Sequence, residues 1–165
     1  MKGKVIVFTG DGKGKTTAAI GTAIRAMGYG KKVVMIQFLK KGNYGETRLK
    51  NENFEIYQFG REEFVIHPEK IDYELASKAM KFAGEILKKK PFLLILDEIN
   101  VALDMGLISL QEVISLLGKR EESHIILTGR NASNEIIKMA DLVTEMKKIK
   151  HYYGAGVKAI EGLEY

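Results

Sequence analysis

Residues 9–17 have the sequence TGDGKGKTT, a glycine-rich segment that contains two lysines. The apolar, β-branched run 4–9 leads into it and predicts a buried strand. Apolar positions at helical spacing follow at 15–27, and glycines at 28 and 30 mark the end of that helix. A strand, a glycine-rich turn and a helix in this order predict a loop that binds phosphate.

The physical reason lies in the glycines and in the helix that follows them. Without a Cβ, glycine lets backbone N–H groups close around phosphate oxygens, and the N-terminus of a helix favours anions. The residues expected to bind ATP are therefore those of the loop itself: Thr9, Gly10, Asp11, Gly12, Lys13, Gly14, Lys15, Thr16 and Thr17.

The end of this loop matches the general phosphate-loop pattern, in which a glycine and four variable residues precede Gly-Lys-Ser/Thr. Gly14, Lys15 and Thr16 fit that ending, whereas Thr9 stands where the first glycine is usual. We expect Lys15 to contact a phosphate as a point charge and the Thr16 hydroxyl to bind Mg²⁺. The alternative is a glycine-rich turn without a ligand, and the register of Lys15 and Thr16 argues against it.

A very apolar strand, expected at 92–96, is followed directly by Asp97 and Glu98. In P-loop proteins a strand beside the first one delivers an acid to the metal ion. We therefore expect this strand to lie next to strand 4–9, with Asp97 and Glu98 holding the metal, one directly and one through water. The alternative is that Asp97 only caps the helix expected to start at residue 99.

Strands alternate with helices along the rest of the chain. Further strands are expected at 32–38, 54–59, 123–127 and 142–146, and further helices at 70–89, at 99–118 with a break near 106, and at 134–139. Strands that are apolar on both faces imply a mostly parallel sheet flanked by helices. We predict an α/β fold in which 1–165 form a single domain, because no linker or repeat interrupts the pattern.

Composition narrows the class of protein further. The 165 residues include no cysteine, which excludes disulfides, thiolate catalysis and cysteine-ligated metal centres. We expect a cytoplasmic protein without a membrane partner, because there is no apolar run of about 18 residues and no recognisable signal peptide. The formal net charge of +5 suits anionic ligands, and without a nucleic-acid-binding motif we expect no nucleic-acid partner.

Two more of the expected strands end in polar side chains. Gln37 lies at the end of strand 32–38, and Arg130 follows strand 123–127. The guanidinium group of Arg130 is suited either to clamping a phosphate or to a surface salt bridge, and both interpretations stay open.

The loop and several distant segments together resemble the P-loop type of ATP:corrinoid adenosyltransferases. The resemblance covers nearly the whole chain and rests on segments 8–19, 30–33, 37–40, 96–99, 128–130, 140–143, 150–151, 155–159 and 162–165. It implies a RecA-like core, ATP bound with Mg²⁺ or Mn²⁺ in the reverse sense to most P-loop proteins, and usually a homodimer.

The function implied by the resemblance is transfer of the 5′-deoxyadenosyl group of ATP to the Co(I) of a reduced corrinoid, with release of tripolyphosphate. This reaction belongs to cobalamin biosynthesis or salvage, and it needs a reductase or another electron donor for Co(II). Lys15, Thr16 and Glu98 are then the candidate catalytic residues, and Arg130 and Phe64 join the loop in binding the substrates.

The chain departs from the family pattern in two places. Longer members carry an N-terminal extension that helps cover the active site, whereas this sequence starts just before its first strand. Some members place two aromatic residues in the segment matching 60–68, where this chain has Phe64 and Ile66. Further candidates for polar contacts to the corrinoid are Asn43, Glu46 and Arg48.

Two other functions are compatible with a phosphate loop. A P-loop ATPase or kinase would cleave at the γ-phosphate, but no distinctive kinase element is recognisable. A nucleotide-binding module without corrinoid activity would keep the loop and lose the acceptor site.

Overall fold

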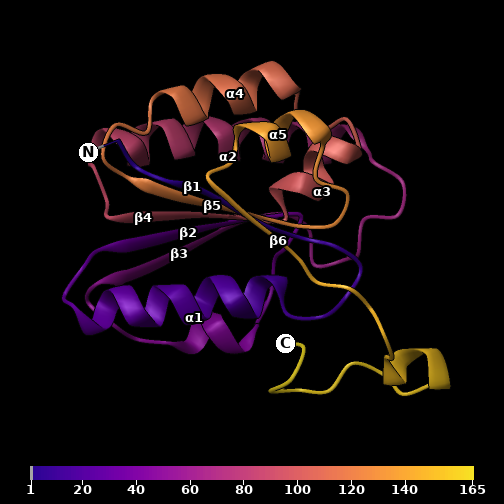
Figure 1. The fold of residues 1–165 in the computed structure, drawn as a ribbon. Coiled ribbons are helices and arrows are strands. Elements are labelled where there is room, and N and C mark those ends of the chain that lie inside the picture. Colours follow the sequence, from indigo (N-terminus) through magenta and orange to yellow (C-terminus); the bar gives the residue numbers. More distant parts are fainter. Residues whose placement is uncertain (1) are drawn as a thin grey trace.

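One parallel sheet with helices on both faces organises the computed structural model, which describes residues 2–165 (Figure 1). Its strands are β1 (Val5–Thr9), β2 (Val33–Phe38), β3 (Phe54–Phe59), β4 (Leu93–Asp97), β5 (His124–Thr128) and β6 (Leu142–Glu145). Its helices are α1 (Lys15–Gly28), α2 (Lys70–Lys88), α3 (Ile99–Asp104), α4 (Leu110–Gly118) and α5 (Asn134–Met139), with short 3₁₀ turns η1 (Gly45–Arg48) and η2 (Tyr152–Ala155).

The elements agree closely with those predicted from the sequence. Each expected strand and helix is present, with ends that shift by no more than about one residue, as is usual for element boundaries. The long segment 99–118 is indeed two helices, because Gly106 adopts a positive φ of 72° after α3 has ended. The prediction of an α/β fold with a parallel sheet is confirmed.

The order of the strands corrects one expectation. The sheet runs β3-β2-β4-β5-β1-β6, so β5 lies between β1 and β4, and the expected direct pairing of β1 with the acidic strand is wrong. The order of parallel strands depends on how the helical crossovers pack, which local sequence patterns do not report. The ends of β1 and β4 nevertheless lie at the same edge of the sheet, because all neighbouring strands are parallel.

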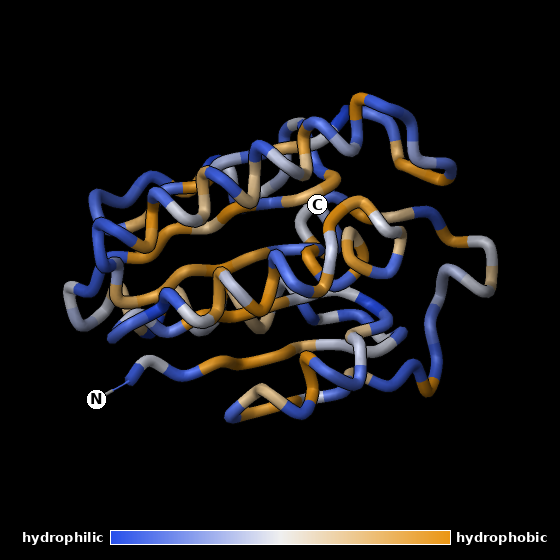
Figure 2. The backbone as a smooth tube through the Cα atoms, turned by 90° about the horizontal axis from the view of Figure 1, so that it is seen from above, coloured by the Kyte–Doolittle hydropathy of each residue, from blue (hydrophilic) through white to orange (hydrophobic). Residues whose placement is uncertain are grey.

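The two faces of the sheet are covered differently. Helix α1 covers one face, while α2, α4 and α5 lie on the other (Figure 1). The contact face of α1 is made of the small buried residues Ala19, Ala23 and Ala26, which let the helix approach the sheet closely. Figure 2 shows apolar strands running between more hydrophilic outer segments. This rigid arrangement fixes the start of α1, and with it the phosphate loop.

Beyond β6 the chain leaves the sheet. Residues 146–165 extend away from the helical layers and carry η2 (Figure 1). Met146, at the start of this segment, accepts a hydrogen bond from the Gly12 N–H at 2.6 Å. The C-terminal segment is therefore anchored at the phosphate loop.

Candidate active site

The phosphate loop is folded against the end of β6. Gly10 and Gly14 have positive φ angles of 98° and 119°, which favour glycine over other residues. A Cβ added at Gly10 or Gly12 would lie within 2.6 Å of the Met146 carbonyl oxygen. These glycines are thus required both by the turn and by the closeness of the neighbouring backbone.

Thr9, which replaces the usual first glycine, is buried and ties the loop to a second segment. Its hydroxyl oxygen accepts a hydrogen bond from the Ala132 N–H at 3.2 Å. The segment after β5, which carries Arg130, is thereby held beside the phosphate loop.

Lys15 folds back onto its own loop. Its Nζ donates to the Gly12 carbonyl oxygen at 2.7 Å. Burial lowers the pKa of the Lys15 ammonium group, with Glu98 opposing that shift and Arg130 adding to it. Among the described residues no carboxylate forms an ion pair with this half-buried cation, and a triphosphate would supply such a counter-charge.

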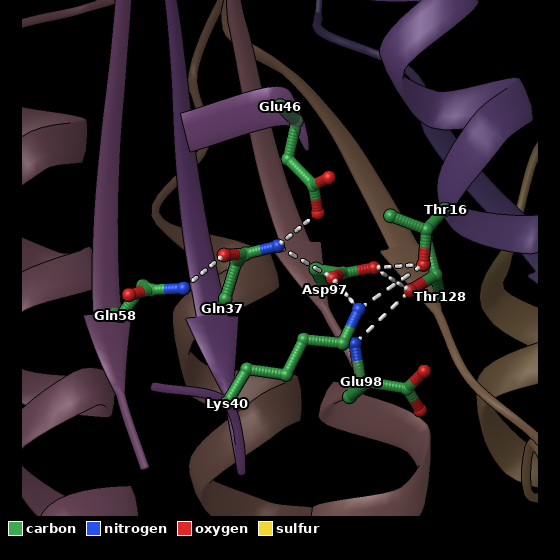
Figure 3. A network of polar contacts seen from close by, with 8 residues as sticks. All are labelled: Thr16, Gln37, Lys40, Glu46, Gln58, Asp97, Glu98 and Thr128. Atoms are coloured by element: carbon green, nitrogen blue, oxygen red, sulfur yellow. Dashed lines mark hydrogen bonds and ion pairs between the residues drawn. The ribbon is translucent and has the colours of Figure 1, made fainter. Parts of the chain in front are cut away.

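Asp97 is the centre of a buried polar network (Figure 3). Its Oδ1 accepts hydrogen bonds from the hydroxyls of Thr16 at 2.8 Å and Thr128 at 2.6 Å. Its Oδ2 accepts from Lys40 Nζ at 2.8 Å and from Gln37 Nε2 at 3.2 Å. Burial alone would raise the pKa of Asp97, but Lys40 and these hydroxyl donors lower it, so the carboxylate is ionised.

The side chain of Asp97 therefore joins β4 to the phosphate loop and to the ends of β2 and β5. The alternative role, capping of α3, is wrong, because Glu98 rather than Asp97 is the residue at the start of that helix, and it makes no side-chain cap. The expected meeting of Thr16 and Asp97 is present in the structure.

Glu98 has an unusual backbone. Its φ of 61° lies in the left-handed region, which costs a non-glycine residue on the order of 1 kcal/mol or more. Its N–H donates to the Thr128 hydroxyl at 3.0 Å, which helps to hold this conformation. Burial and the neighbouring Asp97 charge raise the pKa of the Glu98 carboxyl. A cation placed between these two acids would relieve their repulsion.

A row of amides extends the network away from the loop. Gln58 on β3 donates to the Gln37 side-chain oxygen at 3.0 Å, and Gln37 in turn donates to Glu46 on η1 at 2.9 Å. Gln37 thus bridges Asp97 and η1, as its position at a strand end suggested (Figure 3).

Other candidate residues lie outside this network of hydrogen bonds. Phe64 and Ile66 are 90% and 72% exposed on the loop that precedes α2. Arg130 is exposed, although its charge acts on Lys15 and Glu98. Arg48, the last residue of η1, donates to the Asn43 side chain at 3.0 Å and so holds Asn43 beside η1.

Sequence reasoning assigned no role to Lys40 or Thr128. Lys40 follows β2 by two residues, and Thr128 is the last residue of β5. Both lie where strands end at the edge that carries the loop, which is a usable signal in a parallel sheet. Neither position reveals from sequence alone that its side chain turns toward Asp97.

The oxygen atoms of Thr16, Asp97 and Glu98 fit a Mg²⁺ or Mn²⁺ ion chemically. Such ions prefer oxygen ligands and are commonly bound by one or two carboxylates together with substrate phosphates. Within residues 2–165 no group of three or more His, Asp or Glu side chains forms a self-sufficient metal site. The ammonium group of Lys40 already provides a positive charge against Thr16 and Asp97. The phosphates of a bound nucleotide would supply further oxygen ligands for such an ion.

A phosphate loop that meets a buried strand-end aspartate across parallel strands defines a P-loop nucleotide-binding protein. The family model described as ATP:corrinoid adenosyltransferase BtuR/CobO/CobP matches residues 1–165. The chain belongs to this family, whose members adenosylate corrinoids with ATP.

Individual relatives agree with the family assignment. A corrinoid adenosyltransferase of Sinorhizobium sp is 38% identical over 174 residues, which span 99% of this chain and 81% of the relative. That of Escherichia coli (strain K12) is 36% identical over 170 residues, spanning 99% and 86%. Corrinoid adenosyltransferase CobA of Salmonella typhimurium is 38% identical over 170 residues, which span 99% of this chain and 86% of the relative.

The described helices also bear on membrane association. Across residues 2–165, none combines the length and the apolar character needed to cross a bilayer.

Proposed function

We propose that this chain transfers the 5′-deoxyadenosyl group of ATP to the Co(I) of a reduced corrinoid and releases tripolyphosphate. The observation that carries the proposal is the match of the adenosyltransferase family over the whole chain. The geometry of the phosphate loop and of Asp97 supports it, because a triphosphate leaving group needs several fixed positive charges and N–H donors.

The bond changes set what the protein must do. The Co(I) electron pair attacks the ribose C5′, the C5′–O5′ bond breaks, and its electron pair leaves on O5′ of the tripolyphosphate. Cobalt is the nucleophile, so no side chain has to attack or remove a proton. Positioning of the two substrates and stabilisation of the departing oxygen remain as the tasks of the protein.

The loop residues 9–17 are proposed to bind ATP, with Lys15 and Lys13 as fixed cations against the phosphates. Freed from Gly12 O by a bound phosphate, Lys15 Nζ would neutralise charge on the leaving group. Thr16, Asp97 and Glu98 would hold Mg²⁺ or Mn²⁺, which when bound adds positive charge to the triphosphate. Arg130, beside the loop, is proposed to act on the phosphates, and Phe64 to contact the corrinoid.

Several features of the working protein belong to the same proposal. A reductase or another electron donor would deliver Co(I), and the active form would be a cytoplasmic homodimer of one domain, residues 1–165. The substrates, ATP and a reduced corrinoid, are those that the family uses.

An anaerobic assay tests the proposal. The protein is incubated with ATP, Mg²⁺ and chemically reduced cobalamin, while the corrinoid spectrum is recorded and the phosphate product is identified. We expect an alkylated corrinoid together with tripolyphosphate. Orthophosphate without a spectral change would indicate an ATPase or kinase, and ATP binding without either product would indicate a nucleotide-binding module.

A further inference from the structure

Lys40 places a positive charge at the point where a metal ion would be expected. Its Nζ lies 2.8 Å from Asp97 Oδ2 and 3.5 Å from Thr16 Oγ1, so one ammonium group contacts two of the three proposed metal ligands. Its side chain is 19% exposed, whereas that of Asp97 is fully buried. Lys40 thus reaches Asp97 from the side that opens to solvent.

The backbone around Lys40 holds this position. Leu39 has a positive φ of 59°, and its N–H donates to the Phe59 carbonyl at the end of β3. A Cβ at Gly60 would lie only 2.2 Å from the Lys40 backbone nitrogen, so the ends of β2 and β3 are in close backbone contact. The Lys40 Nζ also lies 5.6 Å from the centre of the Tyr44 ring. The stem is therefore fixed at its base, while the four-carbon side chain keeps its rotatable bonds.

Two cations cannot occupy this place together. A divalent ion bound between Thr16 and Asp97 would stand within a few ångströms of the Lys40 ammonium group, and like charges at such distances repel strongly in a partly buried site. Asp97, in turn, cannot be left without a counter-charge, because a buried unpaired carboxylate is costly.

We propose that Lys40 is an exchangeable counter-ion, a positioning residue that occupies the metal position in the nucleotide-free protein. When the metal–ATP complex binds, the Lys40 ammonium group leaves Asp97 and pairs with a phosphate oxygen of the triphosphate. This inference rests on the proposed function, since it takes the loop to hold a triphosphate beside the metal.

The exchange links metal binding to nucleotide binding. A metal ion alone must displace Lys40 without offering it a new partner, so the metal alone binds weakly. The metal–ATP complex offers the triphosphate as that partner, so the metal and ATP bind cooperatively. Asp97 stays paired in both states, which keeps the phosphate loop in register with β4.

The first test measures Mn²⁺ binding without nucleotide, by electron paramagnetic resonance of the free ion. Lys40→Met keeps the length of the side chain and removes its charge, and Lys41→Met removes an exposed charge one residue away. We expect Lys40→Met to bind Mn²⁺ at least about tenfold more tightly than the wild type, and Lys41→Met to be unchanged. Equal or weaker Mn²⁺ binding by a folded Lys40→Met would overturn the proposal.

A second test uses the wild-type protein, in case Lys40→Met folds poorly. Acylation of lysine amines is followed by mass spectrometry, with Lys41 as the internal reference. Saturating Mn²⁺ alone should speed the labelling of Lys40, because the displaced ammonium group enters solvent, and adding ATP with Mn²⁺ should slow it again. Labelling of Lys40 that does not respond to saturating Mn²⁺ would contradict the exchange.

Neither measurement involves a corrinoid. If Lys40→Met binds Mn²⁺ more tightly but the wild type adenosylates no corrinoid, the proposed function fails and the exchange stands. If the wild type adenosylates cobalamin but Lys40 does not respond to Mn²⁺, the exchange fails alone.

Discussion

At the scale of single residues, Thr128 connects both strand-end acids. Its hydroxyl donates to Asp97 and accepts from the Glu98 N–H. Thr128→Val keeps the shape but leaves the Glu98 N–H and one Asp97 lone pair unpartnered in a buried site. We expect the free energy of unfolding to fall by about 1–3 kcal/mol, measured by urea denaturation.

The matched control is Thr128→Ser, which keeps the hydroxyl and removes one methyl group. We expect it to cost about 1 kcal/mol or less. If serine and valine were equally destabilising, the hydroxyl would not be the cause, and the network around Asp97 would be less important than its geometry suggests.

Lys15 is expected to matter for binding rather than for folding. The only hydrogen bond of its side chain in the described chain is to the nearby Gly12 carbonyl, so Lys15→Ala should leave the folded state and its circular dichroism unchanged. We expect ATP affinity, measured by calorimetry, to fall roughly tenfold to a hundredfold, because a charge-assisted contact to phosphate is lost. Lys78→Ala, on the exposed face of α2, is the control and should bind ATP normally.

Local sequence could identify some of these residues and not others. Lys15 and Thr16 are neighbours at the start of one helix, and Asp97 ends one apolar strand, so each is visible within a short window. Lys40 and Thr128 act through contacts to Asp97 that span 57 and 31 residues. Such contacts depend on which strands lie side by side, and the hydrophobic pattern does not specify this order.

At the scale of elements, the joint between β2 and β3 sets the position of Lys40. A Cβ at Gly60 would meet the backbone of Lys40 and Leu39 at 2.2 and 2.4 Å, so Gly60→Ala must push the two strand ends apart. We expect a loss of roughly 1–3 kcal/mol in the free energy of unfolding. The variant should also bind Mn²⁺ differently, because Lys40 moves with its backbone.

Gly84 in the middle of α2 provides the comparison. A Cβ at this position meets nothing within 4 Å, and alanine is the better helix former. Gly84→Ala should therefore leave stability unchanged or raise it by up to about 1 kcal/mol. If both variants were equally destabilising, the close contact at Gly60 would not be the reason.

The same scale explains the one topological error. The apolar run of β4 and its terminal acids were recognisable, but the position of β5 between β4 and β1 was not. Strand order is fixed by crossovers whose helices pack on one face or the other, and an amphipathic pattern does not say which face of the sheet a helix will cover. The site survives the error because strands pointing the same way bring all their carboxyl ends to one edge.

At the scale of the whole molecule, the sheet and its helices form a rigid support, and the C-terminal segment 151–165 lies beside it. Most of this segment is exposed. It meets η1 through an ion pair between Arg48 and Glu161 at 3.8 Å, and through Gly45, which lies near the Tyr165 carbonyl oxygen. A hollow beside η1 is lined by residues of the loop that precedes η1 and of the C-terminal segment, among them Tyr44, Ala159 and Tyr165.

Deleting residues 151–165 should therefore slow catalysis while leaving the stability of the fold nearly unchanged. The core and the Met146 contact to the phosphate loop remain, so the free energy of unfolding should change by less than about 1 kcal/mol and ATP affinity should persist. Adenosylation of cobalamin should slow by about tenfold or more, because the segment forms one wall of the hollow that includes Asn43, a candidate contact to the corrinoid. A truncated protein with normal kcat/KM would exclude the segment from the acceptor site. A truncated protein that also lost ATP binding would show instead that the C-terminal segment supports the phosphate loop. Glu161→Gln would then tell whether the contact to Arg48 provides that support.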